Sequence, residues 1–210
     1  MRNKKTGFTL IELLVAISVL AIVAVLGWRG LDSIVRARVA LTSDMEQTRG
    51  MQLAFAQLQS DCAQIANTGS IPDRAPVVVD QGRLILVRHV FAENQPTRLQ
   101  VIAYRLKEDG VLTRRESAAT RDMTELDTMW RIAMSDADTT TPVRLQSGLS
   151  AMTMRTWAGN GAGWRSAADL APTTPAGPAA APTVLTGLEV TLQLRERPHA
   201  MTKVFMLGPV

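Results

Sequence analysis

Few residues of this 210-residue chain have the type and spacing that catalysis or metal binding requires. His89 and His199 stand apart, with no serine or cysteine motif and no H-x-x-x-H spacing beside them. Asp136 and Asp138 lie in a stretch without the glycine and glutamate of a calcium loop, which is typical of a solvated loop. The single cysteine, Cys62, cannot form an intramolecular disulfide and fits a buried position on a helix face. The sequence therefore predicts no catalytic site, no metal site and no cofactor.

Glu12 is the residue that raises a chemical question. It is the only charge in the 19 residues from Phe8 to Leu26. As a helix this stretch would be about 28 Å long, close to the ~30 Å hydrocarbon core of a bilayer. This stretch has almost no polar face, whereas a core helix of a soluble protein normally has one. The residues after Leu26 form a poor signal-peptidase site, which argues against a cleaved secretory signal. We predict a transmembrane helix over residues 8–27.

The junction before this helix reads KKTGFTLIE. A basic leader over residues 1–7 ends in Gly7, Phe8 follows, and Glu12 is the fifth residue counted from Phe8. This pattern resembles the class III signal of type IV prepilins and pseudopilins. The resemblance implies that a prepilin peptidase cuts between Gly7 and Phe8 on the cytoplasmic side, that the new Phe8 amine is methylated, and that the helix remains as an anchor.

The resemblance also sets the expected orientation, because three basic residues flank each end of the apolar stretch and charge alone decides nothing. It implies a single-pass protein in the inner membrane of a Gram-negative bacterium, with its C-terminal domain in the periplasm.

Two interpretations of Glu12 remain open. A carboxylate in hydrocarbon is unfavourable by a few kcal/mol or more unless it is paired. In the first interpretation Glu12 meets the Phe8 amine of a neighbouring subunit, so that two charges become one pair inside a helical filament. In the second it reaches the membrane surface from its place near the helix end. The signal pattern favours the first, a role in assembly.

The helix is predicted to continue as an amphipathic segment over residues 28–67, because apolar residues recur every three or four positions and charges, including Asp61, lie between them. Gly27 and Gly30 could form a joint at the membrane surface. The face around Leu31, Ile34 and Val35 is the candidate for helix packing against partners. The recurring apolar set is Leu31, Ile34, Val35, Val39, Leu41, Met45, Leu53, Phe55, Leu58, Cys62 and Ile65.

The period changes to two after this helix, and residues 68–210 are predicted as a β-rich globular domain. Turns are expected at Asp80-Gln81-Gly82, at Asp109-Gly110 and at GNGAGW, and a Pro/Ala-rich loop at 167–183. One long helix followed by antiparallel strands is an α+β fold. The expected strands lie in VVVDQGRLILVRHVF, RLQVIAYRLKEDGVLTRRE, MWRIAM, GLSAMTMRTW, GLEVTLQLRE and MTKVFMLG.

Several of these segments resemble the J-type minor pseudopilin of type II secretion. They are AYRLKEDGVLTRRE, GLSAMTMRTWAGNGAGW, and the closing pair GLEVTLQL and TKVFMLG. The resemblance implies a long N-terminal helix packed on antiparallel β-sheets. It implies a structural role at the tip of the pseudopilus with the I- and K-type minor pseudopilins, supporting assembly and export of folded proteins across the outer membrane.

Two other function classes share parts of this pattern. A minor pilin of a type IV pilus or competence system would carry the same N-terminal signal. The net charge is +4, three of the positives lie in the leader, and aromatic residues make up 4%, so we predict no nucleic-acid partner. The second class is a single-span membrane enzyme facing the periplasm, which would need a pocket with converging titratable groups. The sequence offers no candidate catalytic triad, so we predict that the protein is not an enzyme.

Overall fold

The computed structural model describes residues 8–67, 71, 75–80, 82–135, 140–159, 163–166 and 185–208. Three sequence predictions therefore fall outside the described residues: the leader with Gly7, the acidic pair Asp136 and Asp138, and the Pro/Ala-rich loop at 167–183. Two predicted turns fall partly outside them, at Gln81 and at residues 160–162. The chain divides into two compact units, Met1–Thr48 and Arg49–Val210, and each is described by itself.

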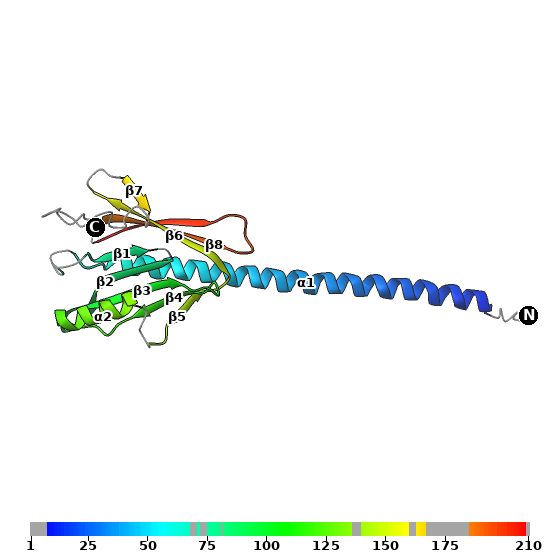
Figure 1. Cartoon of the computed structure of the whole chain (residues 1–210). Helices are drawn as coiled ribbons and strands as arrows, with labels where there is room; N and C mark the ends of the chain where they lie inside the picture. Colours follow the sequence, from blue (N-terminus) through cyan, green and yellow to red (C-terminus); the bar gives the residue numbers. More distant parts are fainter. Residues whose placement is uncertain are drawn as a thin grey trace, which may run out of the picture. The chain divides into compact units, whose positions relative to one another are not determined.

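Helix α1 runs from Leu10 to Ala63 (Figure 1). Its residues up to Thr48 form the first unit, and its remaining turns belong to the second unit. The backbone carbonyl of Thr9 accepts the first hydrogen bonds, from the amides of Glu12 and Leu13. Gly27 and Gly30 lie inside the helix and do not interrupt it. By length and composition α1 contains a stretch able to cross a membrane, with a mean hydropathy of 2.8. The helix ends four residues before the predicted limit of 67.

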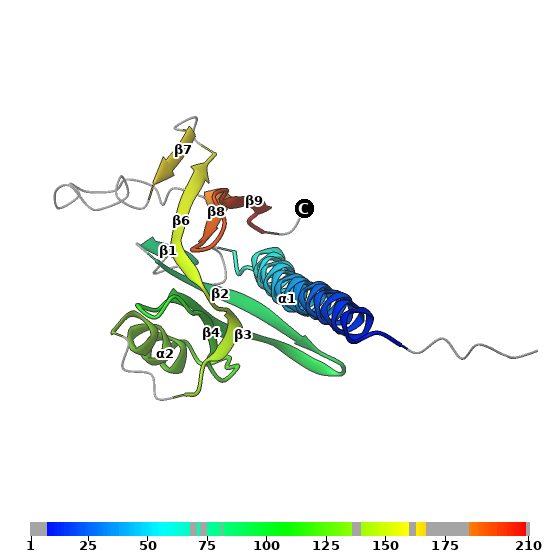
Figure 2. The same cartoon turned by 90° about the vertical axis from the view of Figure 1, so that its right-hand side faces the viewer.

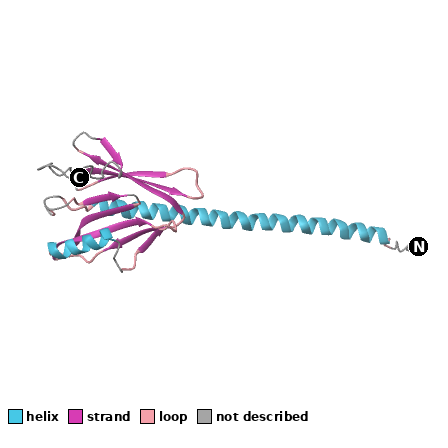
Figure 3. Ribbon diagram, viewed as in Figure 1, coloured by secondary structure: helices cyan, strands magenta, loops and turns pink. Residues whose placement is uncertain are grey.

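The second unit contains two antiparallel sheets and a second helix, α2 (Met123–Ser135), coloured by type in Figure 3. The first sheet has the order β1-β2-β3-β4-β5 and the second has the order β7-β6-β8-β9. The α+β arrangement predicted from the sequence is confirmed. The strands are β1 (Val77–Asp80), β2 (Arg83–Ala92), β3 (Gln95–Leu106), β4 (Leu112–Glu116), β5 (Val143–Gln146), β6 (Leu149–Ala158), β7 (Gly163–Ser166), β8 (Leu185–Leu194) and β9 (Met201–Met206).

Both faces of the first sheet are covered. Alternate residues of β3 face opposite sides, as the period of a strand requires. Ile102 and Tyr104 join the core cluster that holds the C-terminal turns of α1, whereas Leu99 and Val101 join the cluster that holds α2. The C-terminal turns of α1 and helix α2 thus lie on opposite sides of this sheet (Figure 2). The first cluster also contains the inward side chains of β6, β8 and β9, so α1 and both sheets share one core.

The predicted strand MWRIAM (129–134) is wrong, because these residues belong to α2. The Asp122 carboxylate caps this helix by accepting hydrogen bonds from the amides of Thr124 (2.8 Å) and Glu125 (3.4 Å). Its apolar residues Leu126, Met129, Trp130 and Ala133 follow the helical spacing and pack on the sheet. The six residues of the predicted strand, 129–134, are too few to show the helical period of α2.

The turn between β3 and β4 confirms the prediction at Asp109-Gly110. Gly110 has a φ of +81°, in the left-handed region that favours glycine. Its carbonyl accepts a hydrogen bond of 2.9 Å from the amide of Leu149, at the start of β6. This glycine therefore joins the two sheets at a point where the backbone approaches closely.

A Gly110→Ala substitution is expected to lower the free energy of unfolding by about 2–3 kcal/mol in urea titrations. An alanine adds the strain of a positive φ, and its Cβ would press on the Leu149 carbonyl oxygen and lie 2.8 Å from the Arg195 guanidinium. Gly148→Ala is the matched control: its φ is +75°, but a Cβ there meets nothing within 4 Å. We expect a loss of about 1 kcal/mol for the control. Equal losses would show that the close approach at Gly110 is unimportant.

Candidate functional site: the assembly helix and its anchor

The predicted processing and assembly residues lie at the start of α1. Phe8 precedes the helix and is 74% exposed, and Glu12 lies in the first turn. A carboxylate in this turn is favoured by the positive end of the helix dipole. The Thr9 hydroxyl lies 3.5 Å from the Glu12 carboxylate, at the limit of a hydrogen bond. The Glu12 side chain is exposed on the helix surface, where a cation from another chain can reach it.

The predicted helix-packing residues Leu31, Ile34 and Val35 also lie on α1. With 100° of rotation per residue they share one side of the helix. They are 57%, 67% and 52% exposed, respectively. Their apolar surface is thus available to a partner, and they lie beyond the predicted transmembrane residues 8–27.

The C-terminal part of α1 carries the contacts that hold the helix to the β-rich unit. Met51, Phe55, Leu58 and Cys62 are buried at helical spacing, as predicted for the last three of these. Leu53 was predicted to belong to the same set, but it is 57% exposed because it lies on the other side of the helix.

Asp61 is the unexpected member of this buried stripe, with 0% of its surface exposed. The Arg114 guanidinium donates to both carboxylate oxygens, from Nε at 2.8 Å and from Nη2 at 3.1 Å. Arg88 Nη1 donates at 2.7 Å, and Gln57 donates from the preceding turn of α1 at 3.3 Å. The Tyr104 hydroxyl completes the set with a further hydrogen bond. One helix carboxylate is therefore bound by side chains from β2, β3 and β4.

A second layer of contacts holds the two arginines in place. Arg88 donates from Nε (3.2 Å) and Nη2 (2.9 Å) to the Gln100 amide oxygen, and the Gln100 amide in turn donates to the Ser117 carbonyl at 2.7 Å. Arg114 Nη1 donates at 2.8 Å to Glu116, whose side chain is 51% exposed. The cluster therefore contains two guanidiniums and one fully buried carboxylate, with a second carboxylate at the surface.

This environment shifts the pKa of neighbouring groups. Burial, followed by the charge of Asp61 and the hydrogen bond to it, raises the pKa of Tyr104, so its hydroxyl stays protonated and donates. Burial alone would lower the pKa of Arg114, but the hydrogen bonds to Asp61 and Glu116 outweigh it and raise that pKa. Burial and then the charge of Asp61 raise the pKa of the Cys62 thiol to about 12. The thiol is protonated at neutral pH, which fits the predicted structural role of Cys62.

Asp61 was predicted as one of the charges that lie between the apolar residues of the helix, but it is buried with them. Residues 51, 54, 55, 58, 61, 62 and 65 follow one apolar stripe at spacings of three and four, and Asp61 lies inside it. An acid in phase with a buried stripe is the signal that could have identified it. Its partners Arg88 and Arg114 carry no local signal, because their inward direction depends on sheet pairing.

Two family models match this chain. The prokaryotic N-terminal methylation motif matches residues 2–28, and the type II secretion system protein J model matches residues 29–207. No curated protein and no solved structure matches. The two matches together span nearly the whole chain, and the second alone covers most of it. The chain belongs to the protein J family of the type II secretion system.

Proposed function

We propose that this minor pseudopilin of the type II secretion system lies at the tip of the pseudopilus with the I- and K-type minor pseudopilins. There it supports pseudopilus assembly and export of folded proteins across the outer membrane. A prepilin peptidase removes residues 1–7, and Phe8 becomes the methylated N-terminus. The helix then anchors the chain in the inner membrane of a Gram-negative bacterium, with the β-rich unit in the periplasm.

The observation that supports this proposal most strongly is the protein J match over residues 29–207, next to the methylation motif over residues 2–28. The protein J family is structural, and its members associate with other pseudopilins. The helix supplies what such association needs: an apolar anchor, the acid Glu12 in its first turn, and an exposed apolar face at Leu31, Ile34 and Val35. The family match also favours secretion over the alternative of a type IV pilus or competence pilin. No bond-making chemistry is part of this role.

The tip position can be tested by co-expressing the full chain with I- and K-type minor pseudopilins and purifying the complex in detergent. We expect a stable complex with these proteins and no complex with type IV minor pilins. Burying one leucine or isoleucine side chain outside the membrane contributes about 1.5–3 kcal/mol. Leu31→Ser or Ile34→Ser is therefore expected to lower the affinity about tenfold or more.

Leu53→Ser is the matched control, because Leu53 is also 57% exposed on α1 but lies about five turns beyond Val35 along the helix. It is expected to leave the complex intact. Equal losses in Leu31→Ser and Leu53→Ser would contradict the assignment of this face. A wild-type chain that binds type IV minor pilins and neither the I- nor the K-type protein would contradict the tip position itself.

A further inference from the structure

The apolar part of α1 is followed by a tryptophan and an arginine. Trp28 comes directly after the predicted transmembrane residues 8–27, and Arg29 is the next residue. Trp28 is 74% exposed and is the only aromatic residue between Phe8 and Phe55. The helix contains, before this point, a stretch that is long and apolar enough to cross a membrane. The two side chains therefore stand where such a stretch leaves the hydrocarbon.

The length of the helix agrees with this placement. A rise of about 1.5 Å per residue puts Trp28 about 27 Å along the axis from Leu10, the first residue of α1. The hydrocarbon core of a bilayer is ~30 Å thick. When the start of α1 lies at one boundary of the hydrocarbon, Trp28 and Arg29 consequently lie in the headgroup layer at the other boundary.

Neither side chain is occupied by a contact within the chain. Among the described residues, no hydrogen bond, ion pair or ring contact involves the Trp28 indole or the Arg29 guanidinium. Arg36 lies on the same side of the helix, about two turns farther on, and differs in this respect. It forms an ion pair of 2.8 Å with Asp32. Arg29 thus retains its donors for an acceptor outside the chain.

A phospholipid headgroup layer fits both groups. An indole combines an apolar ring with a polar N–H, and tryptophan is enriched where hydrocarbon meets water. A guanidinium presents donors in a planar fork that matches phosphate oxygens. We propose that Trp28 and Arg29 bind phospholipid headgroups on the periplasmic side and thereby fix the depth of α1 in the membrane. This inference rests on the membrane anchor of the proposed function and names the residues that position it.

A neighbouring helix is the competing occupant. Trp28 lies three residues before Leu31 and seven before Val35, on the side predicted for helix packing. The lipid surface is favoured because it offers a phosphate acceptor to Arg29 as well as a boundary to the indole, whereas an apolar helix face offers only packing. In a chain reconstituted without partners, the lipid contact persists and the helix contact does not.

The test for Trp28 is fluorescence of the full chain in vesicles of phosphatidylethanolamine and phosphatidylglycerol, with brominated lipids as quenchers. Bromines near the glycerol end of the acyl chains should quench Trp28 more than bromines near the tail end. Trp28→Phe leaves only the tryptophans of the β-rich unit and should remove this lipid-dependent quenching. Val35→Trp added to Trp28→Phe moves the indole about 10 Å along the same side of α1 and should not restore it.

The test for Arg29 is the reaction of a Gly30→Cys reporter with a membrane-impermeant maleimide in the same vesicles. Arg29→Gln should let the helix sink farther into the bilayer. The reporter should then react more slowly by up to about fivefold, the ratio that one basic side chain at an anionic surface supports. Arg36→Gln is the matched control and should leave the rate unchanged, because Arg36 is already paired with Asp32. Cys62 is 1% exposed and contributes little to the labelling.

Flotation of the vesicles separates failure of this inference from failure of the anchor. A chain that floats with the vesicles but shows no lipid-dependent quenching of Trp28 would overturn the headgroup contact and leave the anchor standing. Quenching that is strongest at the tail end, or equal slowing in Arg29→Gln and Arg36→Gln, would overturn it too. A chain that does not float would contradict the anchor, and this inference with it.

Discussion

Asp61→Asn is expected to lower the free energy of unfolding of the β-rich unit by about 3–5 kcal/mol. Asparagine keeps the size of the side chain and removes the charge. The guanidinium of Arg114, with only 8% of its side chain exposed, would then face a neutral amide, as would that of Arg88. The nearest remaining carboxylate, Glu116, is half-exposed and lies 3.9 Å from Arg88.

The large effect follows from how buried ion pairs stabilise a protein. Removing two charges from water is unfavourable, and their attraction offsets this only when the hydrogen bonds are complete. Asp61 meets that condition, because Arg88, Arg114, Tyr104 and Gln57 all donate to it. Removal of the central carboxylate leaves two cations and a protonated hydroxyl with too few acceptors. The unfavourable desolvation of the arginines then remains without its compensation.

The measurement is urea unfolding of the full chain in detergent, followed by near-ultraviolet circular dichroism from the tryptophans of the β-rich unit. Glu116→Gln is the matched control within the same cluster, and since Glu116 is 51% exposed we expect a loss of at most about 1 kcal/mol. Asp61→Leu combined with Arg114→Met should be more stable than Asp61→Leu alone, because the pair is then replaced by apolar groups. A loss below about 1 kcal/mol in Asp61→Asn would show that the buried cluster does not hold the helix.

The cluster around Asp61 also bears on how the last turns of α1 are held in register on the sheet. The apolar stripe from Met51 to Cys62 allows small slips of a helix along a sheet, since apolar contacts are non-directional. The fork of Arg114 on Asp61 is directional, because Nε and Nη2 must both reach the carboxylate. We infer that Asp61 fixes the register of the last turns of α1 on the sheet.

Local patterns were sufficient for the parts of the fold that depend on neighbouring residues. The long apolar helix, the Asp109-Gly110 turn and the alternation of β3 side chains between two core clusters were all predicted, and the structure confirms them. Their signals are a run of apolar residues, a glycine where φ is positive, and a period of two.

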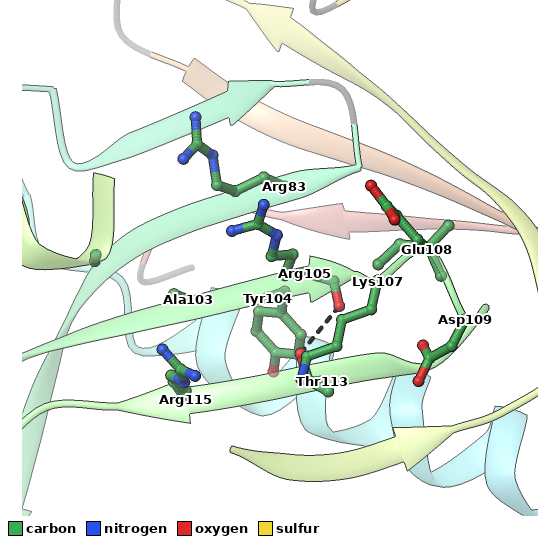
Figure 4. A pocket seen from close by; sticks show the side chains of 11 residues that line it. Arg83, Ala103, Tyr104, Arg105, Lys107, Glu108, Asp109, Thr113 and Arg115 are labelled. Atoms are coloured by element: carbon green, nitrogen blue, oxygen red, sulfur yellow. Dashed lines mark hydrogen bonds between the residues drawn. The ribbon is translucent and has the colours of Figure 1, made fainter. Parts of the chain in front are cut away.

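Other parts depend on partners far away in the sequence. β5 (Val143–Gln146) was not predicted, since it is four residues long, mixes charged and apolar side chains, and forms a strand through pairing with β4. The division of nine described strands into two sheets likewise follows from long-range pairing. The inward direction of Arg114 is a third case, because its own strand shows arginine at 114 and at 115 with nothing to distinguish them. Sheet register decides that Arg114 faces Asp61, whereas Arg115 points to the other face of the sheet and lines a cavity there (Figure 4).

Glu12→Gln is expected to block incorporation of the chain into pseudopili while leaving removal of residues 1–7 intact. In the proposed assembly the Glu12 carboxylate of one subunit pairs with the Phe8 amine of a neighbour inside hydrocarbon. The neutral amide leaves that amine without its counter-ion, which is unfavourable by about 3–5 kcal/mol, or more than a hundredfold in affinity. Glu12→Asp keeps the charge on a shorter side chain and should retain part of the incorporation.

The measurement combines mass spectrometry of the N-terminus with quantification of the chain in cross-linked pseudopili. The competing interpretation, in which Glu12 only reaches the membrane surface, gives the opposite result. A neutral glutamine is easier to place in hydrocarbon than a carboxylate, so incorporation would stay the same or rise. Normal incorporation of Glu12→Gln would therefore exclude the intersubunit pair. Loss of incorporation with an uncleaved leader would instead assign Glu12 to recognition by the peptidase.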